Sequence, residues 1–196
     1  MWSEITSLGD AVLTLSVALA CAIWLAMSNR RLAVLWMACL AAGVAFVGIT
    51  KVLHAGLGVE IEGMDLRMIS GHAMLATAVW TVTAALLLRG RRTACVLGIG
   101  AGLALGAATG AARVLDHSHT VAEAVAGWLT GALVAAVFLR ACARAGVRPG
   151  RPLRAAMLLL FVSTLAYGRS VPLQHYIDEH SSGLCARILA SVPEVL

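Results

Sequence analysis

The stretch that decides the fold is ACVLGIGAGLALGAATGAARVLDHSHTVAEAVAGWLTGALVAAVFLR, residues 94–140. It holds two long apolar runs, 94–112 and 120–139, separated by a short polar turn. A helix that crosses about 30 Å of hydrocarbon needs roughly 20 mostly apolar residues, and each run approaches that length. The stretch therefore predicts two antiparallel transmembrane helices joined at one face of a membrane.

The rest of the chain continues this pattern. Of its 196 residues, 60% are hydrophobic and only 13% are charged, with a mean hydropathy of +0.88, whereas soluble domains carry roughly 25% charged residues. Four further apolar runs are residues 8–27, 32–49, 73–88 and 155–167. We therefore expect an all-α polytopic membrane protein, a single integral membrane domain over 1–196 with about six transmembrane helices. Residues 173–196 are expected to form an interfacial tail.

Charge is divided unequally between the loops. The loops after the first, third and fifth runs hold no Asp or Glu but ten of the 15 basic residues: Arg30, Arg31, Arg89, Arg91, Arg92, Arg140, Arg144, Arg148, Arg151 and Arg154. The positive-inside rule then predicts that these loops are cytoplasmic and that both termini lie outside a bacterial inner membrane. A net charge of +5 distributed in this way indicates membrane topology and argues against a nucleic-acid partner.

Glycines recur every four residues in the fourth and fifth runs. They are Gly98, Gly102, Gly106, Gly110, Gly127 and Gly131. Small residues at this spacing let two membrane helices approach closely. We expect the fourth and fifth helices to pack against each other through these glycines.

All six histidines fall on the predicted outer side, and one of them follows a helix-capping pattern. Ser70-Gly71-His72 stands just before the third run. Ser70 can cap that helix, and the N–H groups at a helix N-terminus attract anions such as phosphate. His72 would then lie beside the anion as an acid; the alternative is a simple helix cap with a neighbouring histidine.

A second pattern joins Arg113, His119 and Glu123 at the turn between the fourth and fifth runs. His119 and Glu123, four residues apart, are expected to share one face of the fifth helix. A carboxylate on one imidazole nitrogen makes the other nitrogen a better nucleophile. The alternative is a structural His–Glu pair. Lys51 is expected at the outer end of the second helix; the alternative is an anchor at the membrane interface.

Together, Lys51, Ser70-Gly71-His72 and Arg113-x5-His119-x3-Glu123 resemble the type-2 phosphatidic acid phosphatase (PAP2) superfamily. Its motifs run roughly K-x6-R-P, P-S-G-H and S-R-x5-H-x3-D, and the resemblance covers residues 45 to 140. The chain departs from this pattern at four places: Ile69 replaces proline, Ala112 replaces serine, Glu123 replaces aspartate, and no Arg-Pro follows Lys51 at the usual spacing.

The resemblance implies a metal-independent phosphatase acting at the periplasmic face on a lipid-linked phosphate, a polyprenyl diphosphate or a phospholipid phosphate. His119 would attack phosphorus to form a phosphohistidine, Glu123 would orient His119, and His72 would protonate the leaving group. The phosphoryl oxygens would be held by Lys51, Ser70, Gly71, Arg113 and, in place of the missing motif arginine, Arg67.

No cofactor or metal is expected. The five cysteines show no C-x-x-C and no paired spacing, which argues against a zinc site and a disulfide framework. Two or three cations at the predicted site would also repel a divalent metal. Two rival readings stay open: a haem-binding protein, although haem ligands usually lie within the spans, and a degenerate family member that binds lipid phosphate without hydrolysing it.

Overall fold

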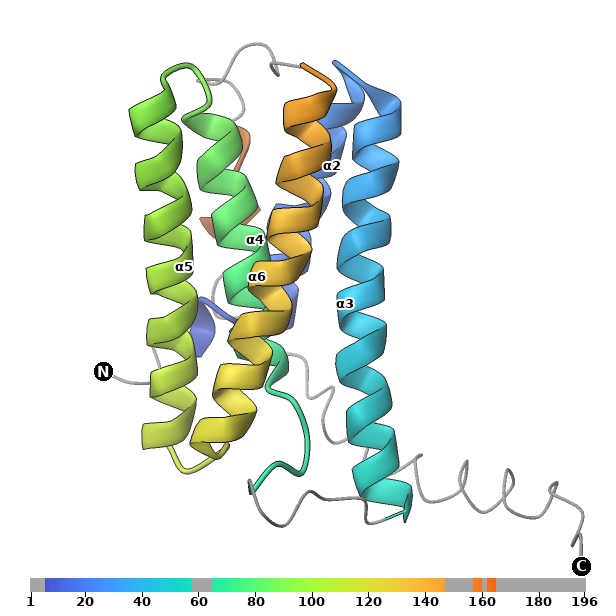
Figure 1. Cartoon of the computed structure of the whole chain (residues 1–196), viewed down its shortest axis with the longest axis vertical. Helices are drawn as coiled ribbons and strands as arrows, with labels where there is room; N and C mark the ends of the chain where they lie inside the picture. The colour runs from blue at the N-terminus through green and yellow to red at the C-terminus, as the bar shows by residue number, and fades with distance from the viewer. Residues whose placement is uncertain (1–5, 58–64, 147–156, 160–161, 165–196) are drawn as a thin grey trace, which may run out of the picture.

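A computed structural model describes residues 6–57, 65–146, 157–159 and 162–164 of the chain. In these ranges the chain is all-α, as predicted, and five long helices pack side by side in a bundle (Figure 1). They are α2 (Ala11–Ala26), α3 (Arg30–Leu57), α4 (Gly71–Leu87), α5 (Arg92–Leu115) and α6 (Val121–Arg144). The predicted sixth span, 155–167, and the tail, 173–196, fall wholly or mostly outside the described residues.

Three of these helices, α3, α5 and α6, are long and apolar enough to cross a membrane. The other two are shorter: α2 has 16 residues and α4 has 17, which corresponds to roughly 24–26 Å at 1.5 Å per residue. Because α4 contacts each of the other four helices, most of its side chains are buried by protein. Its shortness leaves its first residues recessed between longer neighbours (Figure 1).

The glycine ridges of α5 and α6 both pack against α4. The atoms that an added Cβ would overlap belong to the segment that starts α4 or to α4 itself: Thr81 opposite Gly102, Thr77 opposite Gly106, Ser70 opposite Gly127 and Met74 opposite Gly131. The expectation that the two ridges face each other is therefore wrong. Since α4 lies between them, its backbone is the surface that each ridge approaches, while α5 and α6 meet near Gly110 and Ala124.

An aromatic contact holds α3 in place beside α2 and α6. The Trp36 ring centroid lies 5.2 Å from that of Phe138 on α6, and the Trp36 Nε1–H donates to the Ala18 carbonyl of α2 at 3.0 Å. Both aromatic side chains are fully buried. This contact anchors the first turns of α3 against α2 and α6.

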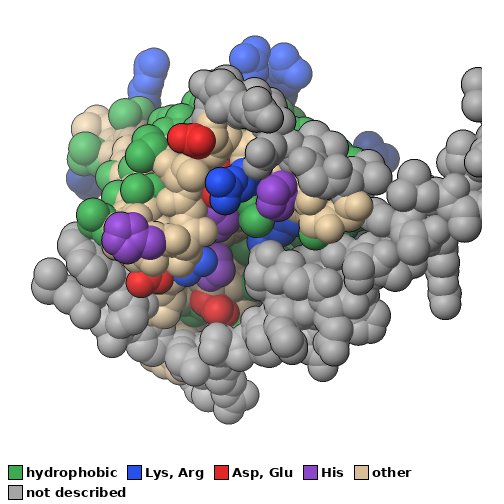
Figure 2. Space-filling view, turned by 90° about the horizontal axis from the view of Figure 1, so that it is seen from below, with side chains coloured by type: hydrophobic (Ala, Val, Ile, Leu, Met, Phe, Trp, Pro, Cys, Tyr) green, Lys and Arg blue, Asp and Glu red, His purple; other side chains and the backbone are tan. Residues whose placement is uncertain are grey.

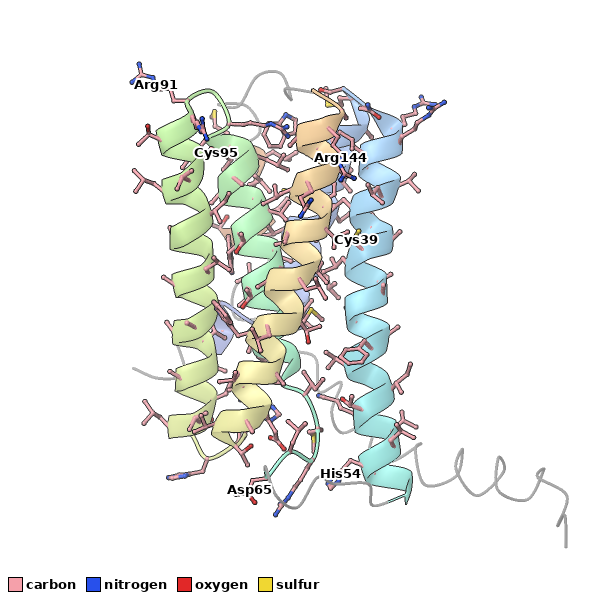
Figure 3. All side chains as sticks on the ribbon, in the orientation of Figure 1. Cys39, His54, Asp65, Arg91, Cys95 and Arg144 are labelled. Atoms are coloured by element: carbon pink, nitrogen blue, oxygen red, sulfur yellow. The ribbon has the colours of Figure 1, made fainter. Side chains whose placement is uncertain are left out.

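The two ends of the bundle differ in their polar residues (Figure 3). Arg91 and Arg144 lie at one end, whereas His54 and Asp65 lie at the other. Because consecutive long helices run in opposite directions, the arginines of the α2–α3 and α4–α5 loops share the first end. The arginine-rich loops and the histidine- and acid-containing segments identified in the sequence therefore lie at opposite ends of one bundle.

Candidate active site

Titratable side chains converge at the end of the bundle that holds Asp65. Figure 2 shows histidine, basic and acidic side chains close together on this end. Four segments supply them: the last turns of α3, the loop 65–70, the start of α4 and the turn between α5 and α6. These segments are distant in sequence, and helix packing brings them together.

His119 and Glu123 form the best-defined contact of the site. His119 Nδ1 lies 2.7 Å from Glu123 Oε2, and the two side chains are only 7% and 5% exposed. The pair does not share a helical face as expected, because His119 precedes α6. Thr120 is the N-cap of α6, and Glu123 is the third helical residue of a capping box. The carboxylate therefore reaches back past the N-cap to the imidazole.

The Glu123 carboxylate accepts four hydrogen bonds. Oε1 accepts from the backbone N–H groups of Arg67 and Met68, each at 3.2 Å. Oε2 accepts from the Thr120 N–H at 3.2 Å as well as from His119. An ionised carboxylate is an acceptor only, so His119 Nδ1 carries the proton in this contact. Its Nε2 then holds the lone pair that a nucleophile requires.

The surroundings of His119 favour its neutral form. Burial lowers the pKa of His119 below its ordinary 6.5, and the charges of Arg113 and Lys51 lower it further. The hydrogen bond and the charge of Glu123 act in the opposite direction and do not overcome these effects. A buried histidine that is neutral near pH 7, with a fixed tautomer, is well suited to nucleophilic attack.

Arg113 adds a cationic group beside His119. Its carbonyl accepts from the N–H groups of Ser118 (3.0 Å) and His119 (3.2 Å), closing the turn in which His117 adopts a left-handed backbone with φ of 54°. Its guanidinium lies 3.8 Å from the exposed Asp116 carboxylate. Its Nε is buried and has no hydrogen-bond partner among the described residues. Buried donors are normally paired, and a donor that belongs to a cation bonds most strongly to an anionic oxygen.

The start of α4 offers backbone N–H groups to the same space. Ser70 is fully buried and caps α4, because its hydroxyl accepts from the Ala73 N–H at 3.5 Å. Gly71 and His72 are the first two helical residues, whose amides have no acceptor within a helix. The structure thus has the cap that the sequence predicts, and it points the α4 N-terminus toward the site.

Lys51 lies within α3, and not at its end as expected, because α3 continues to Leu57. Its charge and that of Arg113 act on both His72 and His119, so all four side chains occupy one neighbourhood. Arg67 has an exposed side chain and meets Glu123 through its backbone. Among the residues that the structure describes, no group of three or more His, Cys, Asp or Glu is placed to hold a metal ion.

Sequence reasoning missed Thr50. Its hydroxyl accepts from the Ile69 N–H at 3.2 Å and donates to the Val47 carbonyl at 2.8 Å, so it joins α3 to the loop that leads into α4. A threonine inside an apolar helix gives no signal of such a contact, apart from its position next to Lys51.

Comparison with known proteins identifies the family of the chain. A profile of the PAP2 superfamily matches residues 60–146, which include the start of α4 and the whole α5–α6 turn. An uncharacterised 22.5 kDa protein from the cps region of Klebsiella pneumoniae is 33% identical over 144 residues, covering 70% of this chain and 68% of the relative. No solved structure matches the chain. The protein belongs to the PAP2 superfamily, a phosphatase family.

Proposed function

We propose that the protein is a metal-independent phosphatase that hydrolyses a lipid-linked phosphate at the periplasmic face of a bacterial inner membrane. The substrate class is a polyprenyl diphosphate or a phospholipid phosphate. The observation that carries this proposal is the buried 2.7 Å contact between His119 Nδ1 and Glu123 Oε2, next to the unpaired Nε of Arg113. Together they supply an oriented nucleophile, His119, and a cation, Arg113, that would bind the phosphate under attack.

In the first step, the lone pair of His119 Nε2 attacks phosphorus. A P–N bond forms, the bond between phosphorus and the leaving oxygen breaks, and His72, which enters this step as the imidazolium, gives its proton to that oxygen and becomes neutral. In the second step, water attacks the phosphohistidine and passes a proton to His72. The P–N bond breaks, its electron pair returns to Nε2, and inorganic phosphate leaves. Glu123 keeps the Nδ1 proton in place throughout.

Electrostatic stabilisation comes from the groups that surround this position. Phosphoryl transfer spreads negative charge over three oxygens, and catalysis depends on cations and fixed dipoles around them. Arg113, Lys51 and the amides of Gly71 and His72 provide both. Ser70 contributes by holding the first turn of α4, and Arg67 through the backbone N–H that orients Glu123.

The position of the site supports a lipid-linked substrate. α4 begins at Gly71, recessed between longer helices that carry exposed apolar side chains such as Val121 and Val125. A phosphate held at this depth lies near the level at which lipid headgroups meet the hydrocarbon. The periplasmic orientation rests on the arginine-rich loops at the opposite end of the bundle.

The test is phosphate release from a panel of lipid phosphates by the purified protein in detergent, with and without EDTA. Turnover should persist in EDTA, and an acid-labile phosphoenzyme should accumulate on rapid quenching. His119→Ala should lose at least about 10³-fold in turnover, roughly 4 kcal/mol of transition-state stabilisation. His117→Ala, which changes an exposed neighbour, should lose far less.

One departure from the family pattern favours a second function. No Arg-Pro follows Lys51 at the spacing of the family motif, so a protein that binds lipid phosphate without hydrolysing it is the alternative. Saturable orthovanadate binding with no turnover of any lipid phosphate would support that alternative and reject the catalytic proposal.

A further inference from the structure

We propose that Thr50 is a positioning residue of the phosphate site. By accepting a hydrogen bond from the Ile69 N–H, it holds the start of α4 at a fixed distance from Lys51. This inference rests on the proposed function for its catalytic consequence, but the contact itself can be tested without turnover. Thr50 lies outside the stretch matched by the family profile, residues 60–146.

Every backbone N–H from residue 67 to residue 70 has an acceptor on a neighbouring helix. The N–H groups of Arg67 and Met68 donate to the Glu123 carboxylate, and that of Ser70 donates to the Glu123 carbonyl at 3.1 Å. These three bonds tie the loop to α6. The fourth, from Ile69 to the Thr50 hydroxyl at 3.2 Å, ties it to α3.

The Thr50 hydroxyl has one orientation. It donates its proton to the Val47 carbonyl of its own helix at 2.8 Å, so a lone pair is left for the Ile69 N–H. Ile69 is 6% exposed and Ser70 is fully buried. An amide buried to this degree is costly to leave without an acceptor, because no water replaces the lost partner.

This bond connects two parts of the proposed anion site. Thr50 is adjacent to Lys51 on α3, and Ile69 is adjacent to Ser70, the N-cap of α4. Without it, the loop would keep its bonds to α6 but lose this hydrogen bond to the helix that carries Lys51. The distance between that cation and the first amides of α4 would then vary, and phosphoryl transfer depends on such positioning.

The bond also accounts for a departure from the family pattern. Ile69 stands where that pattern has proline, and proline has no N–H to satisfy. A chain with isoleucine here carries one more buried donor, and Thr50 is its acceptor. Thr50 and Ile69 therefore form a coupled pair, and a change at one should depend on the residue at the other.

The experiment compares Thr50→Val, Thr50→Ser, Ile69→Pro and the double variant Thr50→Val/Ile69→Pro. The matched control is Thr130→Val, since the Thr130 hydroxyl donates to the Ala126 carbonyl of its own helix at 2.8 Å and, among the described residues, bonds to no other helix. Each variant is assayed for kcat and KM on the best lipid phosphate and for thermal unfolding in detergent.

Thr50→Val should lower kcat by between about tenfold and 100-fold and lower the unfolding temperature. Thr50→Ser should keep both near wild type, because it retains the hydroxyl, and Thr130→Val should stay within about twofold. Adding Ile69→Pro to Thr50→Val should recover part of both losses, since it removes the unpaired donor.

Three results would overturn the inference: equal effects of Thr50→Val and Thr130→Val, a loss in Thr50→Ser as large as in Thr50→Val, or a double variant no better than Thr50→Val. A wild-type protein without turnover would reject the proposed phosphatase function. The pattern of unfolding temperatures would then still decide whether the Thr50–Ile69 contact exists.

Discussion

Replacing Glu123 with glutamine tests the site most directly, because the side chain keeps its size and loses one acceptor. In the structure each carboxylate oxygen accepts from two N–H donors: Arg67 and Met68 at Oε1, Thr120 and His119 at Oε2. A glutamine amide has only one oxygen. In either orientation its NH₂ group therefore faces two N–H donors.

The expected loss follows from which donors are left unpaired. If the NH₂ group faces His119, the imidazole keeps a hydrogen bond only by moving its proton to Nε2, which removes the nucleophile. A wrong tautomer of this kind costs about 10⁴-fold in turnover, or roughly 5 kcal/mol. If the NH₂ group faces the loop instead, two backbone donors lose their acceptor at about 1–3 kcal/mol each. The first outcome appears as lost turnover together with the cost of one unpaired donor, the Thr120 N–H, and the second appears mainly as lost stability.

The pH profile of the variant has a predicted sign. Turnover requires neutral His119, and the neutral form is lost as the pH falls through the pKa of His119, which burial holds below 6.5. Wild-type kcat/KM should therefore fall on the acid side only below about pH 6.5. Glu123 raises that pKa, so in Glu123→Gln the remaining activity should fall at a still lower pH.

The assay is kcat, kcat/KM against pH, and thermal unfolding, with Asp116→Asn as the control. Asp116→Asn also removes a carboxylate near Arg113, but the Asp116 side chain is exposed. Exposed ion pairs contribute about 0–1 kcal/mol to stability. That control should stay within about fivefold of wild type. Near-normal turnover and stability in Glu123→Gln, or an equal loss in the control, would refute this account of the site.

Three further predictions concern packing and orientation. Gly106→Leu should lower the unfolding temperature strongly because the new side chain overlaps α4, while Gly100→Leu, with nothing within 4 Å of its Cβ position, should not; equal stability of the two would contradict the α4 packing. Gly9→Ala should reduce both stability and turnover, since its Cβ would lie 2.6 Å from the Thr109 methyl group and 2.9 Å from the His72 carbonyl oxygen; an unchanged variant would show that this contact is unimportant. Alkaline phosphatase fused after Glu62 should be active and after Arg91 inactive, and the reverse result would place the site in the cytoplasm.

The sequence by itself determined the helices and the local pairs. Apolar runs predicted both ends of α2, α4, α5 and α6 to within about five residues, and they predicted α3 except for its last eight residues. Ser70 predicted the start of α4, and the spacing from Arg113 to Glu123 predicted that His119 meets a carboxylate. These features depend on hydrophobic runs, capping side chains and short separations along the chain. They are local, so a single sequence shows them.

Tertiary structure alone decided the contacts between distant segments. The glycine spacing showed that another helix packs closely against α5 and α6. Only the packed structure shows that this helix is α4. The extension of α3 to Leu57 moved Lys51 into a helix interior, because the residues after it continue the helix despite their mixed polarity. Thr50 and Ile69 are 19 residues apart, and Glu123 lies more than 50 residues from the loop amides that it accepts from. No periodicity encodes such bonds, since they exist only once α3, α4 and α6 are packed together.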